Sequence, residues 1–172
     1  SPLLRIKQGF SRLLLDFALQ VSYDMHEFTS SEERKMGVIL GIDIGGSSTK
    51  IVGLHENGTV IDMLRVKAED PLTSLYGALG NFLATHSLKL TDIGHIALTG
   101  VGASYVDGDI YGVRTIKVEE FPSVGVGGLA LSRKERAVVV SMGTGTSLLW
   151  AEKGGEISHI IGSGIGGGTL SG

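Results

Sequence analysis

Two short segments rich in glycine and hydroxyl side chains each follow an apolar run, and both could hold phosphate groups. The first consists of Asp43, Ile44, Gly45, Gly46, Ser47, Ser48, Thr49 and Lys50. The second consists of Gly143, Thr144, Gly145, Thr146 and Ser147. Glycines in a tight turn let backbone N–H groups approach phosphate oxygens, and a carboxylate such as Asp43 can hold a hydrated Mg²⁺ ion. The pair of turns therefore predicts a nucleotide site, whereas either one alone could be an ordinary glycine turn.

A third glycine-rich segment follows near the end of the chain. It consists of Gly162, Ser163, Gly164, Ile165, Gly166, Gly167, Gly168 and Thr169. So many glycines indicate backbone that closely approaches a ligand, or a helix start directed at an anion. A flexible tail is the alternative interpretation.

Two adjacent carboxylates, Glu119 and Glu120, stand where a strand gives way to a predicted helix. Acidic residues at a helix start commonly interact only with the helix dipole. A carboxylate at such a junction can also act as a general base. The pattern alone favours the first interpretation. The five histidines show no spacing typical of a metal site.

The elements that must position these residues alternate between strands and helices. Residues 38–42, 50–54 and 59–66 read as three consecutive antiparallel strands, joined by the Gly45-Gly46 turn and an Asn57-Gly58 turn. Further strands are expected over 93–98, 115–118, 137–141 and 147–151, and helices after Pro71 and over 119–132. This order predicts an α/β fold with a mixed sheet flanked by helices.

Residues 1–35 differ from the rest, since they carry apolar side chains at roughly helical spacing and end in a charged run. We expect an N-terminal extension or linker, possibly helical in part; a regulatory or partner-binding amphipathic helix is the alternative. Charged residues interrupt every apolar run here, so neither a membrane span nor a signal peptide is predicted.

Composition narrows the class of protein further. The chain has 172 residues, of which 42% are hydrophobic and 19% charged, which excludes an intrinsically disordered chain. The net charge of −3 offers no basic surface for nucleic acid or an acidic membrane. There is no cysteine, so a disulfide scaffold, an iron–sulfur cluster and a cysteine-ligated zinc site are excluded for this chain.

In their order and spacing, the three glycine-rich segments resemble the phosphate and substrate motifs of type II pantothenate kinases, together with Val118, Glu119, Glu120 and Phe121 between them. This family belongs to the actin-like ATPase superfamily, with sugar kinases and heat-shock ATPases. The resemblance covers residues 36–172, and Met36 matches the usual start of such proteins. It implies a ribonuclease H-like, actin-type ATPase domain over 36–172.

The resemblance also implies an activity. The family transfers the γ-phosphoryl group of ATP to the primary hydroxyl of pantothenate, which gives 4'-phosphopantothenate in the first step of coenzyme A synthesis. It implies a cytoplasmic enzyme, a homodimer when complete, that uses ATP and Mg²⁺.

Roles for individual residues follow from the same resemblance. Glu120 would be the catalytic base, and Asp43 would hold Mg²⁺ through water. The residues expected at the ATP phosphates are Gly45, Gly46, Ser47, Ser48, Thr49, Lys50, Gly143, Thr144 and Gly145. Those expected at the substrate are Thr144, Thr146, His159, Gly162 and Gly164.

The chain departs from the family pattern at two places. His159 stands where the family usually has an arginine, and a neutral imidazole stabilises transferred charge less than a guanidinium does. The chain also ends about where a second domain is expected to start, so we expect an incomplete half of the enzyme, inactive by itself.

Other readings stay open. One is a non-catalytic nucleotide-binding fragment or pseudokinase, and another is a kinase of the superfamily with a different substrate, such as the glucokinase type, which often carries a cysteine zinc motif that this chain lacks. A third is the ATPase activator of acyl-CoA dehydratases, which needs cysteines for its cluster.

Overall fold

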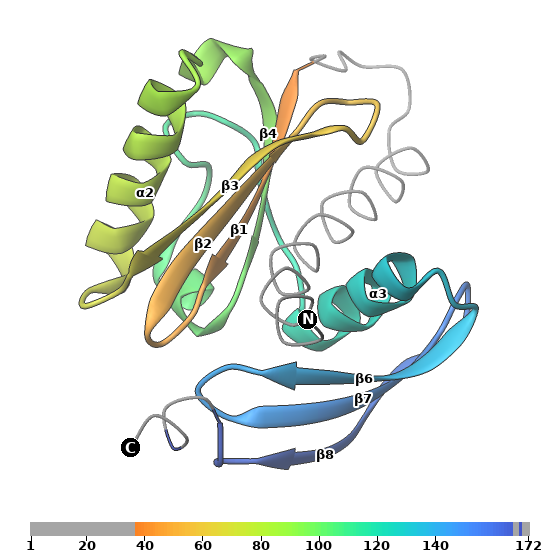
Figure 1. The fold of residues 1–172 in the computed structure, drawn as a ribbon. Coiled ribbons are helices and arrows are strands. Elements are labelled where there is room, and N and C mark those ends of the chain that lie inside the picture. The colour runs from red at the N-terminus through yellow and green to blue at the C-terminus, as the bar shows by residue number, and fades with distance from the viewer. Residues whose placement is uncertain (1–36, 167–168, 170–172) are drawn as a thin grey trace, which may run out of the picture. The chain divides into compact units, whose positions relative to one another are not determined.

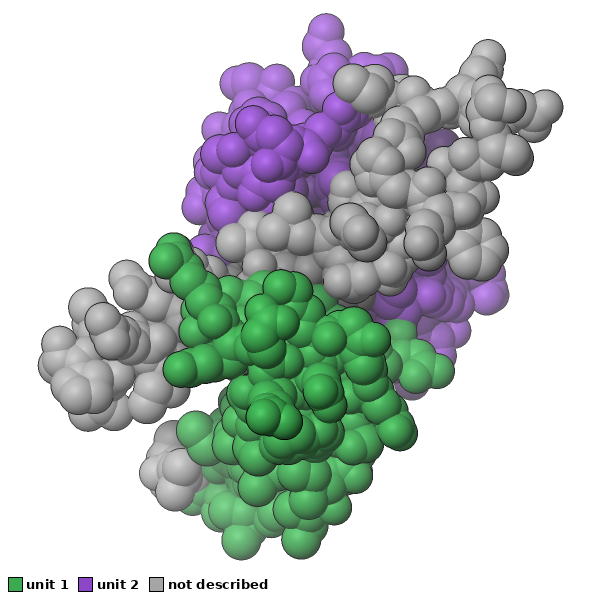
Figure 2. Space-filling view, turned by 90° about the vertical axis from the view of Figure 1, so that its right-hand side faces the viewer, with its two compact units in different colours: residues 1–17, 119–172 green, residues 18–118 purple. Residues whose placement is uncertain are grey.

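The computed structural model describes residues 37–166 and residue 169. The described residues up to Val118 form one compact unit, and those from Glu119 onward form another; Figure 2 distinguishes the two by colour. Following the order of the chain, we call the part up to Val118, purple and labelled unit 2 in Figure 2, the first unit, and the part from Glu119, green and labelled unit 1 there, the second unit. The extension expected over residues 1–35 lies outside the described residues, as does Met36.

The first unit is built on a five-stranded mixed sheet with the strand order β3-β2-β1-β4-β5 (Figure 1). Its strands are β1 (Val38–Ile44), β2 (Ser48–Leu54), β3 (Val60–Lys67), β4 (Ile93–Thr99) and β5 (Thr115–Lys117). The first three pair antiparallel, whereas β1, β4 and β5 run parallel to one another. The predicted meander of three antiparallel strands is therefore confirmed.

Helix α2 (Pro71–Thr85) covers one face of this sheet. It begins after Asp70, whose carboxylate accepts a hydrogen bond of 2.7 Å from the backbone N–H of Thr73, with Pro71 in the first turn. Its buried residues recur at helical spacing and meet the apolar side chains of the strands: Leu75, Ala78, Leu79 and Phe82. Each large side chain buried here contributes about 1.5–3 kcal/mol.

Short connections complete the first unit. The 3₁₀ helix η1 (Leu90–Asp92) leads into β4, and η2 (Val101–Tyr105) follows β4 directly. The loop before β5 is fixed at Thr115, whose hydroxyl accepts from the N–H of Ile110 and whose own N–H donates to Asp109. These hydrogen bonds hold β5 in place at the edge of the sheet.

The second unit pairs one helix with a three-stranded antiparallel sheet of order β6-β7-β8. It consists of α3 (Glu120–Ser132), β6 (Arg136–Met142), β7 (Thr146–Glu152) and β8 (Ile157–Ser163). Glycines let the helix approach the strands closely: a Cβ on Gly125 would lie 2.5 Å from the side chain of Ile157, and one on Gly128 would lie 2.5 Å from that of Val139. Leu129 and Leu149 are buried between helix and sheet.

The other face of this small sheet exposes a row of apolar side chains. The residues are Val138, Val140, Met142, Trp150 and Ile161, each 37–59% exposed. Cross-strand pairing places Val138 opposite Trp150 and Leu148 opposite Ile161, so they share one face. A contiguous apolar surface of this kind is typical of an interaction face.

The architecture is thus α/β, with a mixed five-stranded sheet and a second, antiparallel sheet. Two features differ from the expectation of a single sheet: β6 and β7 join the separate small sheet, and the residues that open the third glycine-rich segment belong to a strand, β8. No helix in the part of the chain that the structure describes is long and apolar enough to cross a bilayer.

Candidate functional site

The first predicted turn sits at the tip of the β1–β2 hairpin and carries an ion pair at its base. Asp43 in β1 and Lys50 in β2 face each other in the antiparallel ladder, and Lys50 Nζ lies 2.6 Å from Asp43 Oδ2. Their side chains are only 18% and 13% exposed. A charge-assisted hydrogen bond in such surroundings is strong and well oriented. The pair thus presents a carboxylate and an ammonium group at one end of the sheet.

The hairpin tip itself has the properties of an anion receptor. The N–H of Gly45 donates to the carbonyl of Ser48 at 3.1 Å and closes the turn. Gly46 and Ser47 are exposed, and their N–H groups make no hydrogen bond to another described residue. A Cβ on Gly46 would meet nothing within 4 Å, so space is open above the tip. Successive backbone N–H groups in a turn are a common anion-binding arrangement.

The predicted hydroxyl donors at this turn differ in their surroundings. Ser47 is exposed at the tip, whereas Ser48 is 3% exposed and Thr49 is fully buried. Thr49 pairs with Ile44, so its side chain shares the face of the sheet that packs against α2. The residues exposed at the tip are therefore Gly46 and Ser47, and the mostly buried Asp43–Lys50 pair lies at the base of the turn.

The end of β4 closes the site beside Asp43. Thr99 pairs with Asp43 in the parallel ladder, and Gly100 follows with φ +89°. A Cβ on Gly100 would lie 2.4 Å from Asp43 Oδ1 and 2.6 Å from the carbonyl oxygen of Ile44. Only glycine fits this close approach at this backbone conformation. Sequence reasoning had not given Thr99 or Gly100 a role.

The second and third glycine-rich segments lie against each other in the second unit. The hydroxyl of Thr146 donates to the carbonyl of Ile165 at 2.7 Å. A Cβ on Gly166 would lie 2.4 Å from the carbonyl oxygen of Thr144, and one on Gly145 would lie 2.7 Å from that of Ser163. The structure therefore brings these two segments together, with Thr144 exposed at their surface and Thr146 joining them.

Two further predicted residues belong to the region at the start of α3: Glu120 lies in the helix, and His159 contacts the next residue, Phe121. Glu120 is the first residue of the helix, and both it and Glu119 are exposed. Its neighbour Phe121 stacks on His159, with ring centroids 4.6 Å apart and an interplanar angle of 2°. A Cβ on Gly162 would lie 3.2 Å from Nε2 of that imidazole, so the ring lies between Phe121 and Gly162. Gly164 stands beyond it, with open space around its Cα.

The predicted residues are divided between the two units. Asp43, Lys50 and the hairpin tip belong to the first unit. Glu120, His159 and the second and third glycine-rich segments belong to the second unit, with Gly167 and Gly168 outside the described residues.

The metal expectation concerns a single carboxylate. In the part of the chain that the structure describes, no three His, Cys, Asp or Glu side chains gather into a metal-binding group. Mg²⁺ usually keeps several waters and binds through one or two carboxylates and substrate phosphates. Asp43, beside an open turn of N–H groups, fits that mode of binding.

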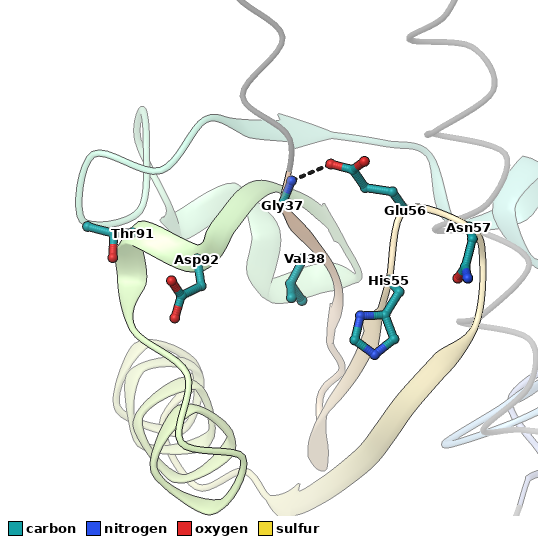
Figure 3. A pocket seen from close by; sticks show the side chains of 7 residues that line it. All are labelled: Gly37, Val38, His55, Glu56, Asn57, Thr91 and Asp92. Atoms are coloured by element: carbon teal, nitrogen blue, oxygen red, sulfur yellow. Dashed lines mark hydrogen bonds between the residues drawn. The ribbon is translucent and has the colours of Figure 1, made fainter.

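A shallow pocket opens at the opposite end of β1 (Figure 3). Its lining residues are Gly37, Val38, His55, Glu56, Asn57, Thr91 and Asp92. The carboxylate of Glu56 accepts a hydrogen bond from the N–H of Gly37. None of the residues predicted to bind phosphate or substrate lines this pocket.

Two titrating groups of the first unit have shifted pKa values. Burial lowers the pKa of His95 in β4, and the positive charge of Arg114 lowers it further while Glu56 opposes the change. The hydrogen bonds from Thr73 lower the pKa of Asp70 at the start of α2. Neither group belongs to the predicted site.

Comparison with solved structures shows the fold type. Component A of the (R)-2-hydroxyglutaryl-CoA dehydratase of Acidaminococcus fermentans matches with a TM-score of 0.60 and 16% identity, over 72% of this chain and 47% of that one. The activator of the 2-hydroxyisocaproyl-CoA dehydratase of Clostridium difficile, with bound ADPNP, matches with a TM-score of 0.58 and 17% identity, over 72% and 45%. A protein of Chromobacterium violaceum, named as a candidate N-acetylglucosamine kinase, matches with a TM-score of 0.54 and 17% identity, over 73% of this chain and 48% of that one.

The chain therefore has the α/β fold that these structures share. The chain spans less than half the length of each of the three structures. No protein-family model matches the sequence, and the search of curated proteins found no match. None of the matches reported above is a pantothenate kinase.

Proposed function

We propose that this chain carries the phosphate-binding elements of an ATP-dependent kinase that phosphorylates pantothenate. The observation that supports this most is the β1–β2 hairpin: an open glycine turn above a buried Asp43–Lys50 pair, on a fold of the actin-like ATPase type. An enzyme that positions a metal-bound triphosphate needs three kinds of group. These are N–H groups that bind the phosphates, an ammonium group and a carboxylate.

In this proposal the first unit binds the ATP phosphates. The N–H groups of Gly46 and Ser47 donate to phosphate oxygens, and Lys50 adds positive charge beside them. Asp43 holds Mg²⁺ through water, and the metal, when bound, neutralises charge on the phosphates. The hydroxyls of Ser48 and Thr49 are buried in the fold, so the contribution of these two residues is to position the turn.

The second unit contributes the acceptor side of the reaction. Glu120 accepts the proton of the substrate hydroxyl as it attacks the γ-phosphorus, a role that its exposed place at the start of α3 allows. Gly143, Thr144 and Gly145 supply further donors to the phosphates. Thr144, Thr146, His159, Gly162 and Gly164 border the substrate, and the stacking of His159 on Phe121 holds the imidazole there.

The proposal includes the expectation that this chain acts as part of a longer, homodimeric cytoplasmic enzyme and is inactive alone. Residues 36–172 would then be the nucleotide-phosphate-binding part of the fold. The exposed apolar face of the β6-β7-β8 sheet supports this, because such a face is normally covered by further structure. In this proposal the further structure helps to exclude water from the transfer step, which is why we expect no activity from the chain alone.

A second candidate is an ATPase that activates another enzyme, as the activator of the 2-hydroxyisocaproyl-CoA dehydratase does according to its name. The fold likeness favours this candidate as much as it favours a kinase. The absence of cysteine from the 172 residues counts against it, since this chain can then ligate no iron–sulfur cluster. A sugar kinase is a further candidate within the same fold.

The test is a phosphoryl-transfer assay on a protein in which this chain is continued by the rest of the fold. Radiolabelled ATP is supplied with pantothenate, with N-acetylglucosamine or with no acceptor. We expect label on pantothenate only. Label on the sugar identifies a sugar kinase, and release of phosphate without an acceptor favours the activator. The 172-residue chain alone should show no transfer.

A further inference from the structure

One buried hydroxyl at the edge of the proposed phosphate site has no protein partner. Thr99, the last residue of β4, is 5% exposed, and its Oγ1 is buried without a hydrogen-bond partner among the described residues. A buried polar atom in this state destabilises the fold, so it is usually retained only where a ligand or water completes it. The position of Thr99 in the sheet indicates which ligand this is.

Thr99 lies in the same row of the sheet as the ion pair. It pairs with Asp43 in the parallel β1–β4 ladder, and Asp43 pairs with Lys50 in the antiparallel β1–β2 ladder. Paired residues of adjacent strands project to the same face of the sheet. Gly100, next to Thr99, lies so close to Asp43 Oδ1 that it holds the carboxylate beside the end of β4. The hydroxyl and the carboxylate therefore border one small region.

Thr49 provides a matched contrast. It is also a fully buried threonine without a hydrogen-bond partner for Oγ1 in the described chain. It pairs with Ile44 and Val66, however, and so projects to the opposite face, where α2 and the apolar core lie. Its two cross-strand partners on that face, Ile44 and Val66, are apolar. The two hydroxyls thus share residue type and burial but differ in what they face.

We propose that Thr99 is a positioning residue for the hydrated metal that Asp43 holds: its Oγ1 accepts a hydrogen bond from a metal-bound water. This inference rests on the proposed nucleotide site. Water bound to Mg²⁺ is a strong donor, and Mg²⁺ keeps several of its waters when it binds to one carboxylate. A hydroxyl in the same row as Asp43 fixes the orientation of that hydration shell, as hydrogen bonds from outer residues do at other metal sites.

The experiment measures how much Mg²⁺ improves nucleotide binding by a protein in which this chain is continued by the rest of the fold. Affinity for the ATP analogue ADPNP is determined by calorimetry in Mg²⁺ and in EDTA, for the wild type, Thr99→Val, Thr99→Ser and Thr49→Val. Thermal unfolding without ligand is recorded for each variant. Valine keeps the shape of threonine and removes the hydroxyl, whereas serine keeps the hydroxyl.

We expect Thr99→Val to lose about tenfold in affinity with Mg²⁺ and to match the wild type in EDTA, since it removes one hydrogen bond to a charged group. Thr99→Ser should behave as the wild type. Both valine variants should unfold at an equal or higher temperature than the wild type, because each removes an unsatisfied polar atom. Thr49→Val, whose hydroxyl is on the opposite face from Asp43, should change the affinities with Mg²⁺ and in EDTA by the same factor, so that its gain from Mg²⁺ equals that of the wild type.

Other outcomes separate the inference from the proposed function. If the wild type binds ADPNP and Thr99→Val gains as much from Mg²⁺ as the wild type does, Thr99 has no role at the metal while the nucleotide site stands. The same holds if Thr49→Val and Thr99→Val lose affinity equally, since the effect is then structural. If the wild-type protein with the rest of the fold binds no ADPNP with or without Mg²⁺, the proposed function is overturned, and the inference with it.

Discussion

Nζ of Lys50 and Oδ2 of Asp43 lie 2.6 Å apart, directly opposite each other across the first two strands of the chain. Both side chains are mostly buried, so each charge depends on the other for stabilisation. The pair therefore links the stability of the hairpin to the chemistry proposed for its tip. A substitution that removes one partner of the pair should therefore lower the free energy of unfolding more than a double substitution that removes both.

Asp43→Asn should destabilise the chain, because the Lys50 ammonium then loses its carboxylate partner in a largely buried place. We expect a loss of about 1–3 kcal/mol in the free energy of unfolding, measured by urea denaturation. The double variant Asp43→Asn with Lys50→Met should recover part of that loss. Strictly additive losses in the double-mutant cycle would contradict the coupling of the two residues.

Gly100→Ala should be strongly destabilising and should displace the Asp43 carboxylate. The added Cβ would lie 2.4 Å from Asp43 Oδ1, at a φ of +89° that L-residues rarely adopt. We expect at least about 2 kcal/mol of lost stability from strain and overpacking. Gly46→Ala is the control, because its Cβ would meet nothing within 4 Å. A Gly100→Ala chain as stable as Gly46→Ala would show that β4 does not pack against Asp43.

Local signals were sufficient for the first sheet. The Asn57-Gly58 turn and the Gly45-Gly46 turn separate three apolar runs, and turn chemistry of this kind fixes a hairpin without knowledge of the rest of the fold. The observed strands β1, β2 and β3 agree with that prediction within a few residues. Helix α2 was predictable for the same reason, since Pro71 marks its start and Leu75, Leu79 and Phe82 repeat at helical spacing.

Strand β8 could not be predicted in the same way. Its register with β7 shifts at Leu148 and Leu149, so Ile160 and Ile161 stand side by side instead of alternating with polar residues. A strand with this irregularity has no period of two in its sequence. Nothing local shows which of two sheets β6 and β7 join, because that choice depends on packing against α3.

The same limit applies to the site. The types of Asp43, Lys50 and the turn residues indicated phosphate binding directly. The role of Thr99 depends on its pairing with Asp43 in the parallel β1–β4 ladder, and the stacking of Phe121 on His159 depends on the placement of β8. Such long-range register is set by the whole core, so it became visible only in three dimensions.

His95 should make the stability of the chain depend on pH. Burial and Arg114 lower its pKa in the folded chain from the ordinary 6.5, against the opposing charge of Glu56. The unfolded chain then binds a proton at a higher pH than the folded chain does. Stability is therefore complete above pH 6.5 and decreases as the pH falls below that value, by up to about 1.4 kcal/mol per pH unit.

Urea denaturation at several pH values between 7.5 and 5.5 measures this slope. His95→Gln should flatten it, because glutamine does not titrate. His55→Gln, at an exposed position outside the core, should leave it unchanged. If the slope persists in His95→Gln, another group is responsible for the acid sensitivity.

Glu120 and Glu119 provide the test of the proposed general base, in a protein that continues this chain with the rest of the fold. Glu120→Gln keeps the size of the side chain but cannot accept the substrate proton, so kcat should fall by about 10²–10⁴-fold. ATP affinity should barely change, because the phosphates are held by the turns at residues 45–49 and 143–146. Glu119, which precedes the helix and makes no side-chain capping hydrogen bond, should tolerate glutamine with a loss of only a few tenths of a kcal/mol. Equal losses of kcat in both variants would indicate a structural role for the acidic helix start, and a loss in Glu119→Gln alone would move the base by one residue.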